Sequence, residues 1–72
     1  MEFSGKKFKN KIIERGYTIK GFAKKINKSE VAMHCYFMGV YVPKAKTLIL
    51  SALILKCQLE DFFEGECDYR EN

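Results

Sequence analysis

The sequence predicts an all-α domain built from five short helices. Three observations lead to this prediction. Apolar residues recur at helical spacing, residues that favour helix starts and stops stand between these runs, and no convincing strand is present. A chain of 72 residues holds one small domain with a small core. We expect this domain to span residues 1–65 and an acidic C-terminal tail to follow at 66–72.

The first two helices are predicted from an apolar stripe and a cap. Residues 6–15 carry apolar side chains at positions 8, 12 and 13 on an otherwise basic helix, and Gly16 follows as a stop. Thr18 is a suitable N-cap for the second helix. Its apolar positions are 19, 22, 23 and 26, and the pattern breaks at 27 and 28.

The remaining helices follow the same logic. Ser29 is a suitable N-cap for a third helix over residues 30–38, which Gly39 ends. An extended segment leads to Pro43, which is predicted to open a fourth helix at about 44–56. A short fifth helix is predicted over residues 58–64, and residues 40–42 are too few to form a strand.

Positive charge is concentrated in the first two thirds of the chain. Residues 1–46 hold 11 basic and three acidic residues, a net charge of +8, whereas residues 47–72 hold two basic and six acidic residues, a net charge of −4. A basic body with an acidic tail suits a partner such as nucleic acid. The alternative is that the charge serves only solubility.

The cysteines indicate the compartment and exclude several chemistries. Cys35, Cys57 and Cys67 form no C-x-x-C pair, and the chain starts without a signal peptide, so we expect free thiols and a cytoplasmic protein. With His34 they match no zinc-ligand spacing, so we expect neither a metal nor a cofactor. Neighbouring His34 and Cys35 diverge on a helix, and no glycine-rich phosphate loop is present, so we expect no catalytic residues and no enzyme activity. No apolar stretch approaches the roughly 20 residues of a membrane span.

The chain from about position 8 to position 63 resembles the helix-turn-helix domain of phage repressors and Cro proteins (the XRE type). The match to the family pattern runs over this stretch without a gap. The residues that carry the resemblance are Gly16, Tyr17, Thr18, Phe22, Ala23, Ile26, Ser29, Met33, Tyr36, Gly39, Pro43, Thr47, Leu48, Ala52, Leu55, Leu59, Phe62 and Phe63. The resemblance implies a five-helix lambda-repressor-like fold. It also implies binding of operator DNA as a dimer, regulation of transcription, and a recognition helix at 30–38 in the major groove.

Two positions and the character of one helix depart from this family pattern. Ile19 stands where a phosphate-binding Gln is usual, and Lys28 stands where an apolar residue fills the turn. The proposed recognition helix is also unusually apolar. When Met33 and Tyr36 face the core, the outward positions are Val31, His34, Cys35 and Met38.

The resemblance places candidate DNA contacts on and around this helix. Val31 suits a thymine methyl. Glu30 either accepts from a cytosine amino group or stabilises the helix N-terminus, and His34 is either a base or phosphate donor or a solvated surface side chain. The expected base-facing residues are Glu30, Val31, His34 and Cys35. The expected phosphate contacts, whose alternative is a solvated basic face, are Thr18, Lys20, Lys24, Lys25, Lys28, Ser29, Lys44 and Lys46.

The fourth helix is apolar on nearly every side, and so small a domain cannot cover it completely. We therefore expect a self-association surface that includes Leu50, Leu53, Ile54 and Phe63. The alternative is that the tail or the fifth helix covers this surface.

These observations predict a sequence-specific regulator of transcription, of the repressor type, that binds double-stranded DNA as a homodimer. The alternative is a helix-turn-helix scaffold used as a protein–protein interaction module that does not read DNA. The apolar recognition face and Ile19 favour this alternative.

Overall fold

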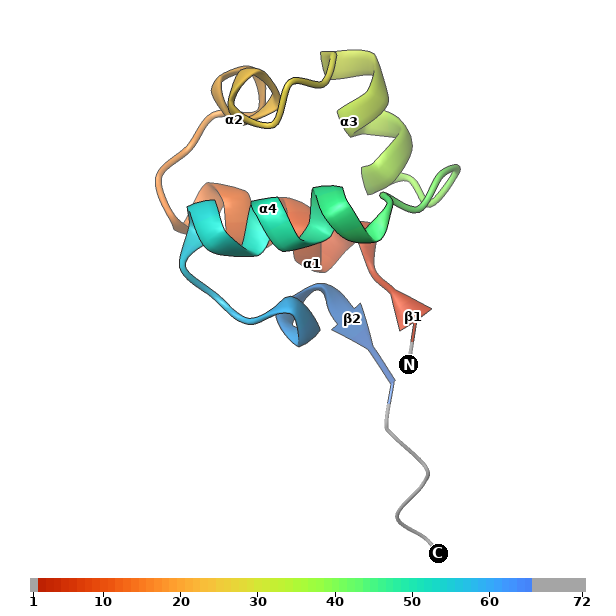
Figure 1. The fold of residues 1–72 in the computed structure, drawn as a ribbon. Coiled ribbons are helices and arrows are strands. Elements are labelled where there is room, and N and C mark those ends of the chain that lie inside the picture. Colours follow the sequence, from red (N-terminus) through yellow and green to blue (C-terminus); the bar gives the residue numbers. More distant parts are fainter. Residues whose placement is uncertain (1, 66–72) are drawn as a thin grey trace, which may run out of the picture.

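Four α-helices and a pair of short strands make up the fold in the computed structural model, which describes residues 2–65 (Figure 1). The helices are α1 (Gly5–Glu14), α2 (Ile19–Lys25), α3 (Glu30–Phe37) and α4 (Ala45–Leu55). Strand β1 (Glu2–Phe3) pairs with β2 (Phe63–Glu64), which follows the short 3-10 helix η1 (Leu59–Phe62). The predicted acidic tail at 66–72 lies outside the described residues.

The prediction of an all-α fold with five helices is wrong. The described chain has four α-helices and a two-stranded antiparallel sheet, and residues 58–64 form η1 and β2 in place of a fifth helix. The backbone turns extended at Phe63, with φ −117° and ψ 153°. Phe63 then lies opposite Phe3 in the strand ladder, with their ring centroids 6.0 Å apart. Because the partner of β2 is at the far end of the chain, no local pattern indicates this strand.

The second and third helices begin at the predicted caps. The Thr18 Oγ accepts from the Gly21 N–H at 3.0 Å, and the Ser29 Oγ accepts from the Ala32 N–H at 3.1 Å. Each cap supplies an acceptor to an N–H that the helix itself leaves without a partner. The starts of α2 and α3 are therefore confirmed as predicted.

The first helix begins earlier than predicted because Ser4 caps it. The Ser4 Oγ accepts from the Lys7 N–H at 3.1 Å, and α1 starts at Gly5. A Cβ built on Gly5 would lie 2.6 Å from the Phe37 carbonyl carbon and closer still to the Tyr36 and Phe37 carbonyl oxygens. Only a glycine therefore allows the start of α1 to approach the end of α3 this closely.

The ends of the helices are set by left-handed residues. Gly16 (φ 89°) follows α1 and Gly39 (φ 81°) follows α3, as predicted. Pro43 does not itself open the fourth helix: Lys44 is the N-cap, α4 begins at Ala45, and Lys56 ends the helix at φ 55°.

Phe8 lies at the centre of the core. Its ring contacts Phe22, Tyr36 and Phe62 edge-on, with centroids 6.2, 6.4 and 5.0 Å away. One aromatic residue of α1 thus joins α2, α3 and η1, and these edge-to-face contacts add to its burial. Ile13 was expected in the same apolar stripe but is 54% exposed.

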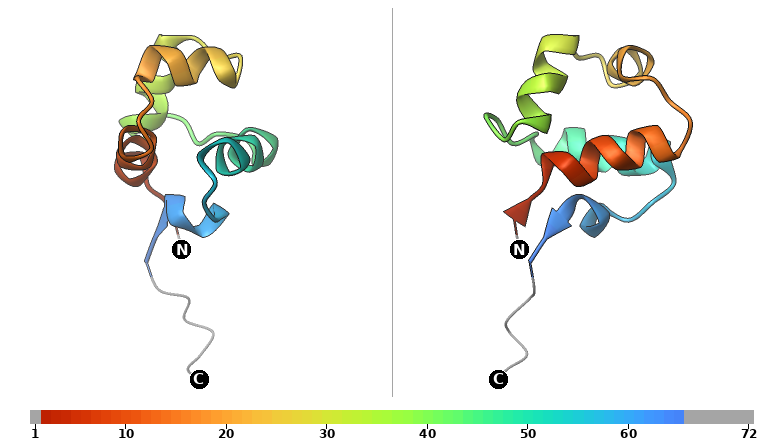
Figure 2. Two further views of the ribbon diagram at one scale, coloured as in Figure 1. Left: turned by 90° about the vertical axis from the view of Figure 1, so that its left-hand side faces the viewer. Right: turned by 180° about the vertical axis from the view of Figure 1, so that it is seen from behind.

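The elements lie at three levels (Figure 2). Helices α2 and α3 form one end of the molecule, α1 and α4 lie in the middle, and η1 with the strands forms the opposite end. Over the stretch from Glu2 to Gly65, no helix is both long enough and apolar enough to cross a membrane.

Candidate nucleic-acid interface

Helices α2 and α3 form a helix-turn-helix unit. The turn between them spans residues 26–29, where Asn27 adopts φ 59° and the Lys28 N–H donates to the Ala23 carbonyl at 2.8 Å. Phe22 of α2 and Met33 of α3 are fully buried. Both helices are therefore anchored on the core by one side, and the opposite side of α3 faces outward.

The predicted base-facing residues lie on this outward side, with one exception. Glu30, Val31 and His34 are exposed, whereas Cys35 is only half-exposed. The Cys35 carbonyl accepts from the Val40 N–H at 3.0 Å and so holds the loop that follows α3. Three of the four residues are thus available to a ligand through their side chains.

The outward side of α3 is dominated by apolar side chains. Val31 is 72% exposed, and Met38, the C-cap, is 78% exposed. His34 lies between them, with its ring edge-on to Phe37 at 6.1 Å. The loop after α3 adds further exposed apolar residues, which sequence reasoning did not single out: Val40, Tyr41 and Val42.

All eight predicted phosphate contacts are exposed, from Thr18 to Lys46. They do not share one surface. Lys20 and Lys24 are four residues apart on one side of α2, whereas the Lys25 Nζ lies 5.8 Å from the centre of the Tyr17 ring. Thr18 and Ser29 use their hydroxyl oxygens as cap acceptors, which leaves each hydroxyl hydrogen free to donate.

A cleft of about 330 Å³ brings two of these lysines together. Lys28, in the turn, and Lys46, in the first turn of α4, both line it. Lys44 is the N-cap of α4, but its side chain makes no cap hydrogen bond. The first backbone N–H groups of α4 therefore lack a capping side chain as acceptor. Two cations and a helix N-terminus therefore meet at one opening, an arrangement that favours an anion.

Charge is segregated along the molecule. Residues 17–46, which include α2 and α3, hold six lysines and one acidic residue, Glu30. The acidic residues Glu2, Glu60, Asp61 and Glu64 lie on the strands and η1, at the other end of the fold (Figure 1). The helix-turn-helix end is therefore the basic end, and a polyanion is attracted to it.

The predicted self-association surface is only partly formed. Leu50 and Leu53 are exposed on α4, at 40% and 70%. Ile54 and Phe63 pack against the core and are half-buried. Sequence reasoning missed Ile49, which is 51% exposed one turn before Leu53. The exposed apolar face of α4 is thus Ile49, Leu50 and Leu53, and we call it the α4 face.

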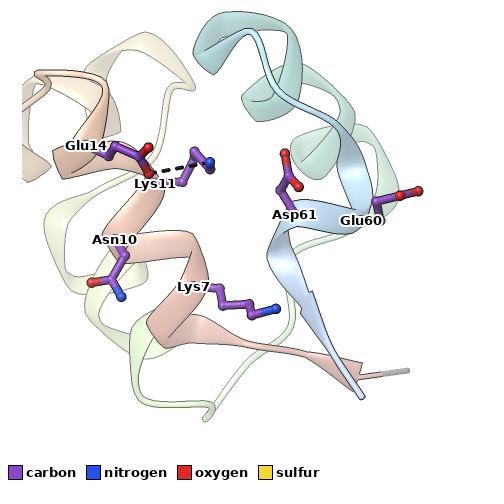
Figure 3. A pocket seen from close by; sticks show the side chains of 6 residues that line it. All are labelled: Lys7, Asn10, Lys11, Glu14, Glu60 and Asp61. Atoms are coloured by element: carbon purple, nitrogen blue, oxygen red, sulfur yellow. Dashed lines mark ion pairs between the residues drawn. The ribbon is translucent and has the colours of Figure 1, made fainter. Parts of the chain in front are cut away.

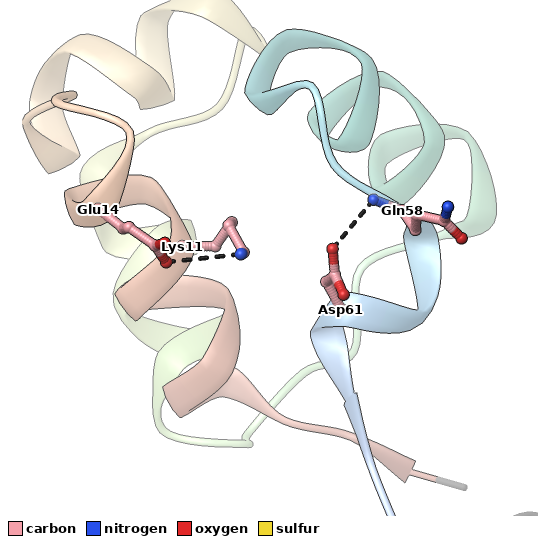
Figure 4. A network of polar contacts seen from close by, with 4 residues as sticks. All are labelled: Lys11, Glu14, Gln58 and Asp61. Atoms are coloured by element: carbon pink, nitrogen blue, oxygen red, sulfur yellow. Dashed lines mark hydrogen bonds and ion pairs between the residues drawn. The ribbon is translucent and has the colours of Figure 1, made fainter.

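A second pocket, of about 260 Å³, lies between α1 and η1 (Figure 3). Its charged side chains make structural contacts. The Lys11 Nζ pairs with the Glu14 Oε1 at 3.4 Å, and the Asp61 Oδ2 accepts from the Gln58 N–H at 3.1 Å (Figure 4). The Lys7 Nζ donates to the Phe63 carbonyl at 3.0 Å. Of these three contacts, the Lys7 hydrogen bond joins α1 to β2, whereas the other two lie within α1 and within η1 with its N-cap.

The thiol of Cys57 is a weak nucleophile at neutral pH. Burial, and next the carboxylate of Asp61, raise the pKa of the Cys57 thiol above its ordinary value. The side chain therefore stays a neutral thiol at neutral pH, the form that is a poor nucleophile. Within residues 2–65 no group of three or more His, Cys, Asp or Glu side chains is placed to hold a metal ion.

No family model, curated protein or solved structure matches this chain.

Proposed function

We propose that this chain is a sequence-specific DNA-binding regulator of transcription, of the repressor type, that resembles the phage repressor and Cro proteins. One observation carries the proposal. The outward side of α3 is exposed in a helix-turn-helix unit, and residues 17–46, which include α2, α3 and the start of α4, hold six lysines against a single acidic residue. The major groove of B-DNA admits an α-helix, and its two phosphate backbones run along either side.

The mechanism follows from the position of the charges. With α3 in the major groove, Lys28, Lys46 and the N-terminus of α4 bind phosphate on one side. Lys20 and Lys24 on α2 bind phosphate further along. Thr18 and Ser29 cap the two helix starts with their hydroxyl oxygens and donate their hydroxyl hydrogens to DNA phosphates. Occupancy of the operator then blocks RNA polymerase from the same DNA.

The active species in this proposal is a homodimer formed through the α4 face. Three exposed apolar side chains on one helix lose contact with water when a second copy covers them. A two-fold axis would present two copies of α3 to two half-sites of a palindrome. Half-sites one helical turn apart, about 34–36 Å, are the expected geometry.

The test is fluorescence anisotropy with a pool of random double-stranded DNA at two salt concentrations, followed by selection of the bound sequences. We expect salt-sensitive binding that enriches a palindromic site. Lys46→Ala should weaken binding to all sequences and reduce the salt slope by about 1, because one phosphate contact is lost.

A matched charge reversal provides the control. Lys24→Glu, on α2, should abolish binding, whereas Lys6→Glu, an exposed residue of α1, should bind close to wild type after the change in net charge is allowed for. Equal effects of the two substitutions would reduce the proposal to non-specific charge attraction. Absence of binding at low salt would refute it.

The homodimer has its own test by analytical ultracentrifugation. Leu53→Asp should yield a monomer and lose the palindrome-selective part of DNA affinity. Ile13→Asp changes an exposed apolar residue on α1, away from the α4 face, and should leave the dimer intact. A wild-type protein that stays monomeric at high concentration would contradict the dimer.

A protein partner for α3 is the second candidate, because exposed Val31 and Met38 also suit an apolar protein surface. In that case Val31→Asp would abolish a salt-insensitive complex with the partner, and Lys24→Glu would leave it intact.

A further inference from the structure

The chemistry of the outward side of α3 limits what it can recognise. Its exposed apolar side chains Val31 and Met38 lie seven residues apart and therefore on the same face of the helix. Base edges are usually read by side chains that donate or accept two hydrogen bonds, such as Arg, Gln and Asn. None of these three residue types occurs among residues 30–38.

An apolar side chain placed against a polar base edge is unfavourable. It removes water from the base nitrogen or oxygen and offers no hydrogen bond in return. The apolar group that a base presents in the major groove is the methyl at C5 of thymine. Contact between two apolar groups removes both from water and is favourable.

From these observations we infer that α3 reads DNA through pyrimidine C5-methyl groups, so that its target sites carry thymines opposite Val31 and Met38. This inference rests on the proposed function and adds the class of sequence that is recognised. Methyl-bearing cytosine presents the same group at the same ring position and is bound in place of thymine.

The surroundings of Val31 make it the more selective of the two contacts. A β-branched side chain on a helix has one strongly preferred rotamer, so its methyl groups have fixed positions. The helix beneath it is also fixed, by Ser29 at its start and by buried Met33 on its inner side. Met38, at the C-cap, has a flexible thioether and adapts to more than one step of the DNA.

Charge favours DNA over a protein as the occupant of this face. Lys20 and Lys24 on α2, Lys28 in the turn and Lys46 at the start of α4 are all exposed. Within residues 2–65 none of these lysines forms an ion pair. The outward side of α3 has apolar side chains at its centre and lysines around them. The major groove of DNA has the matching arrangement, with thymine methyl groups in the groove and a phosphate backbone along each side.

The experiment uses sites selected from the random pool and changes one atom group at a time. Replacing a thymine by deoxyuridine removes only the C5-methyl group. Replacing an adenine by 7-deazaadenine removes only the N7 acceptor. We expect deoxyuridine to weaken binding about fourfold at each contacted thymine, the effect of losing one buried methyl group. We expect 7-deazaadenine to change binding less than twofold.

A double-mutant cycle assigns the contact to Val31. At the position opposite Val31, Val31→Ala should bind thymine and deoxyuridine equally, with the salt slope of the wild type, because its phosphate contacts are intact. Ile13→Ala removes exposed apolar atoms from α1 and should keep the fourfold preference for thymine. Restoring the methyl group as 5-methylcytosine in a matched site should restore the affinity.

The outcomes separate this inference from the proposed function. Salt-dependent, selective DNA binding without any preference for thymine over deoxyuridine overturns methyl readout and leaves the proposed function standing. A large loss with 7-deazaadenine also overturns it, in favour of hydrogen-bond readout. No DNA binding at low salt overturns both.

Discussion

Gly5→Ala tests whether the close approach of α1 to the end of α3 holds α3 in place. On helix propensity alone this change should stabilise the protein by about 1 kcal/mol, because Ala is the better helix former. The structure predicts the opposite sign. The new Cβ would lie 2.6 Å from the Phe37 carbonyl carbon and nearer still to the Tyr36 and Phe37 carbonyl oxygens.

The magnitude follows from which atoms are in the way. They are backbone atoms at the end of α3, so no rotamer change can relieve the overlap and one helix has to move. Overpacking of this kind costs about 1–3 kcal/mol, and we expect a net loss of about 2 kcal/mol. A domain of this size has a total free energy of unfolding of about 4–10 kcal/mol. Each 1 kcal/mol lost lowers its melting temperature by about 4–8 °C, so a loss of about 2 kcal/mol lowers it by about 8–16 °C.

The assay is thermal and urea unfolding followed by circular dichroism, with Lys6→Ala, one residue further along α1, as the matched control. The control should stay within about 0.5 kcal/mol of wild type because Lys6 is exposed. A Gly5→Ala protein as stable as wild type, or more stable, would show that α1 and α3 are not in contact as described. In the folded fraction, binding of the selected DNA should also weaken because α3 is displaced.

Three further changes give distinct results. Ser29→Ala should lower the free energy of unfolding by about 1 kcal/mol through loss of the cap, whereas Ser29→Asp should keep the cap but weaken DNA binding; wild-type DNA affinity in Ser29→Asp would argue against a phosphate at this position. Phe8→Ala should lower the free energy of unfolding by about 3–5 kcal/mol in urea titrations, since the ring is fully buried among three elements; a loss below 2 kcal/mol would contradict that packing. The raised pKa of Cys57 means that the folded state holds the thiol proton more tightly than the unfolded state. The resulting stability is complete below the ordinary thiol pKa of 9.0 and declines as pH rises through the folded pKa, so wild type should lose more stability than Cys57→Ser between about pH 8 and 10.5. Identical pH profiles of the two proteins would contradict this.

The helices were predictable because their signals are local. Thr18 and Ser29 cap helices within three residues of themselves, and Gly16 and Gly39 mark ends by their own backbone conformation. The helical spacing of the apolar residues in α2 likewise identifies the buried side of that helix. Such features need no knowledge of the rest of the chain.

The strands were not predictable in this way. Each has two residues, and each is stable only because the other lies beside it from the opposite end of the sequence. Gly5 is a similar case, since nothing near it in sequence indicates that Tyr36 and Phe37 lie against it.

The candidate interface was predictable as a set of exposed residues but not as an arrangement. The helical period places Val31 and His34 outward. It does not indicate that Lys28 and Lys46 line one cleft, because that depends on how α4 crosses the turn. On α4, Ser51 is fully buried with its hydroxyl donating to the Thr47 carbonyl at 2.8 Å, while Leu53 is exposed. Polarity alone assigns these two residues the wrong way round.

The pairing of β1 with β2 has a practical consequence for engineering. Glu2 and Glu64 lie opposite each other, so a short linker there could join the two ends of the fold into a circular permutant. The two strands also lie on the side of the molecule away from α2 and α3 (Figures 1 and 2). A fluorescent protein or an enzyme joined next to either strand would therefore stand clear of α3, the recognition helix of the proposed function.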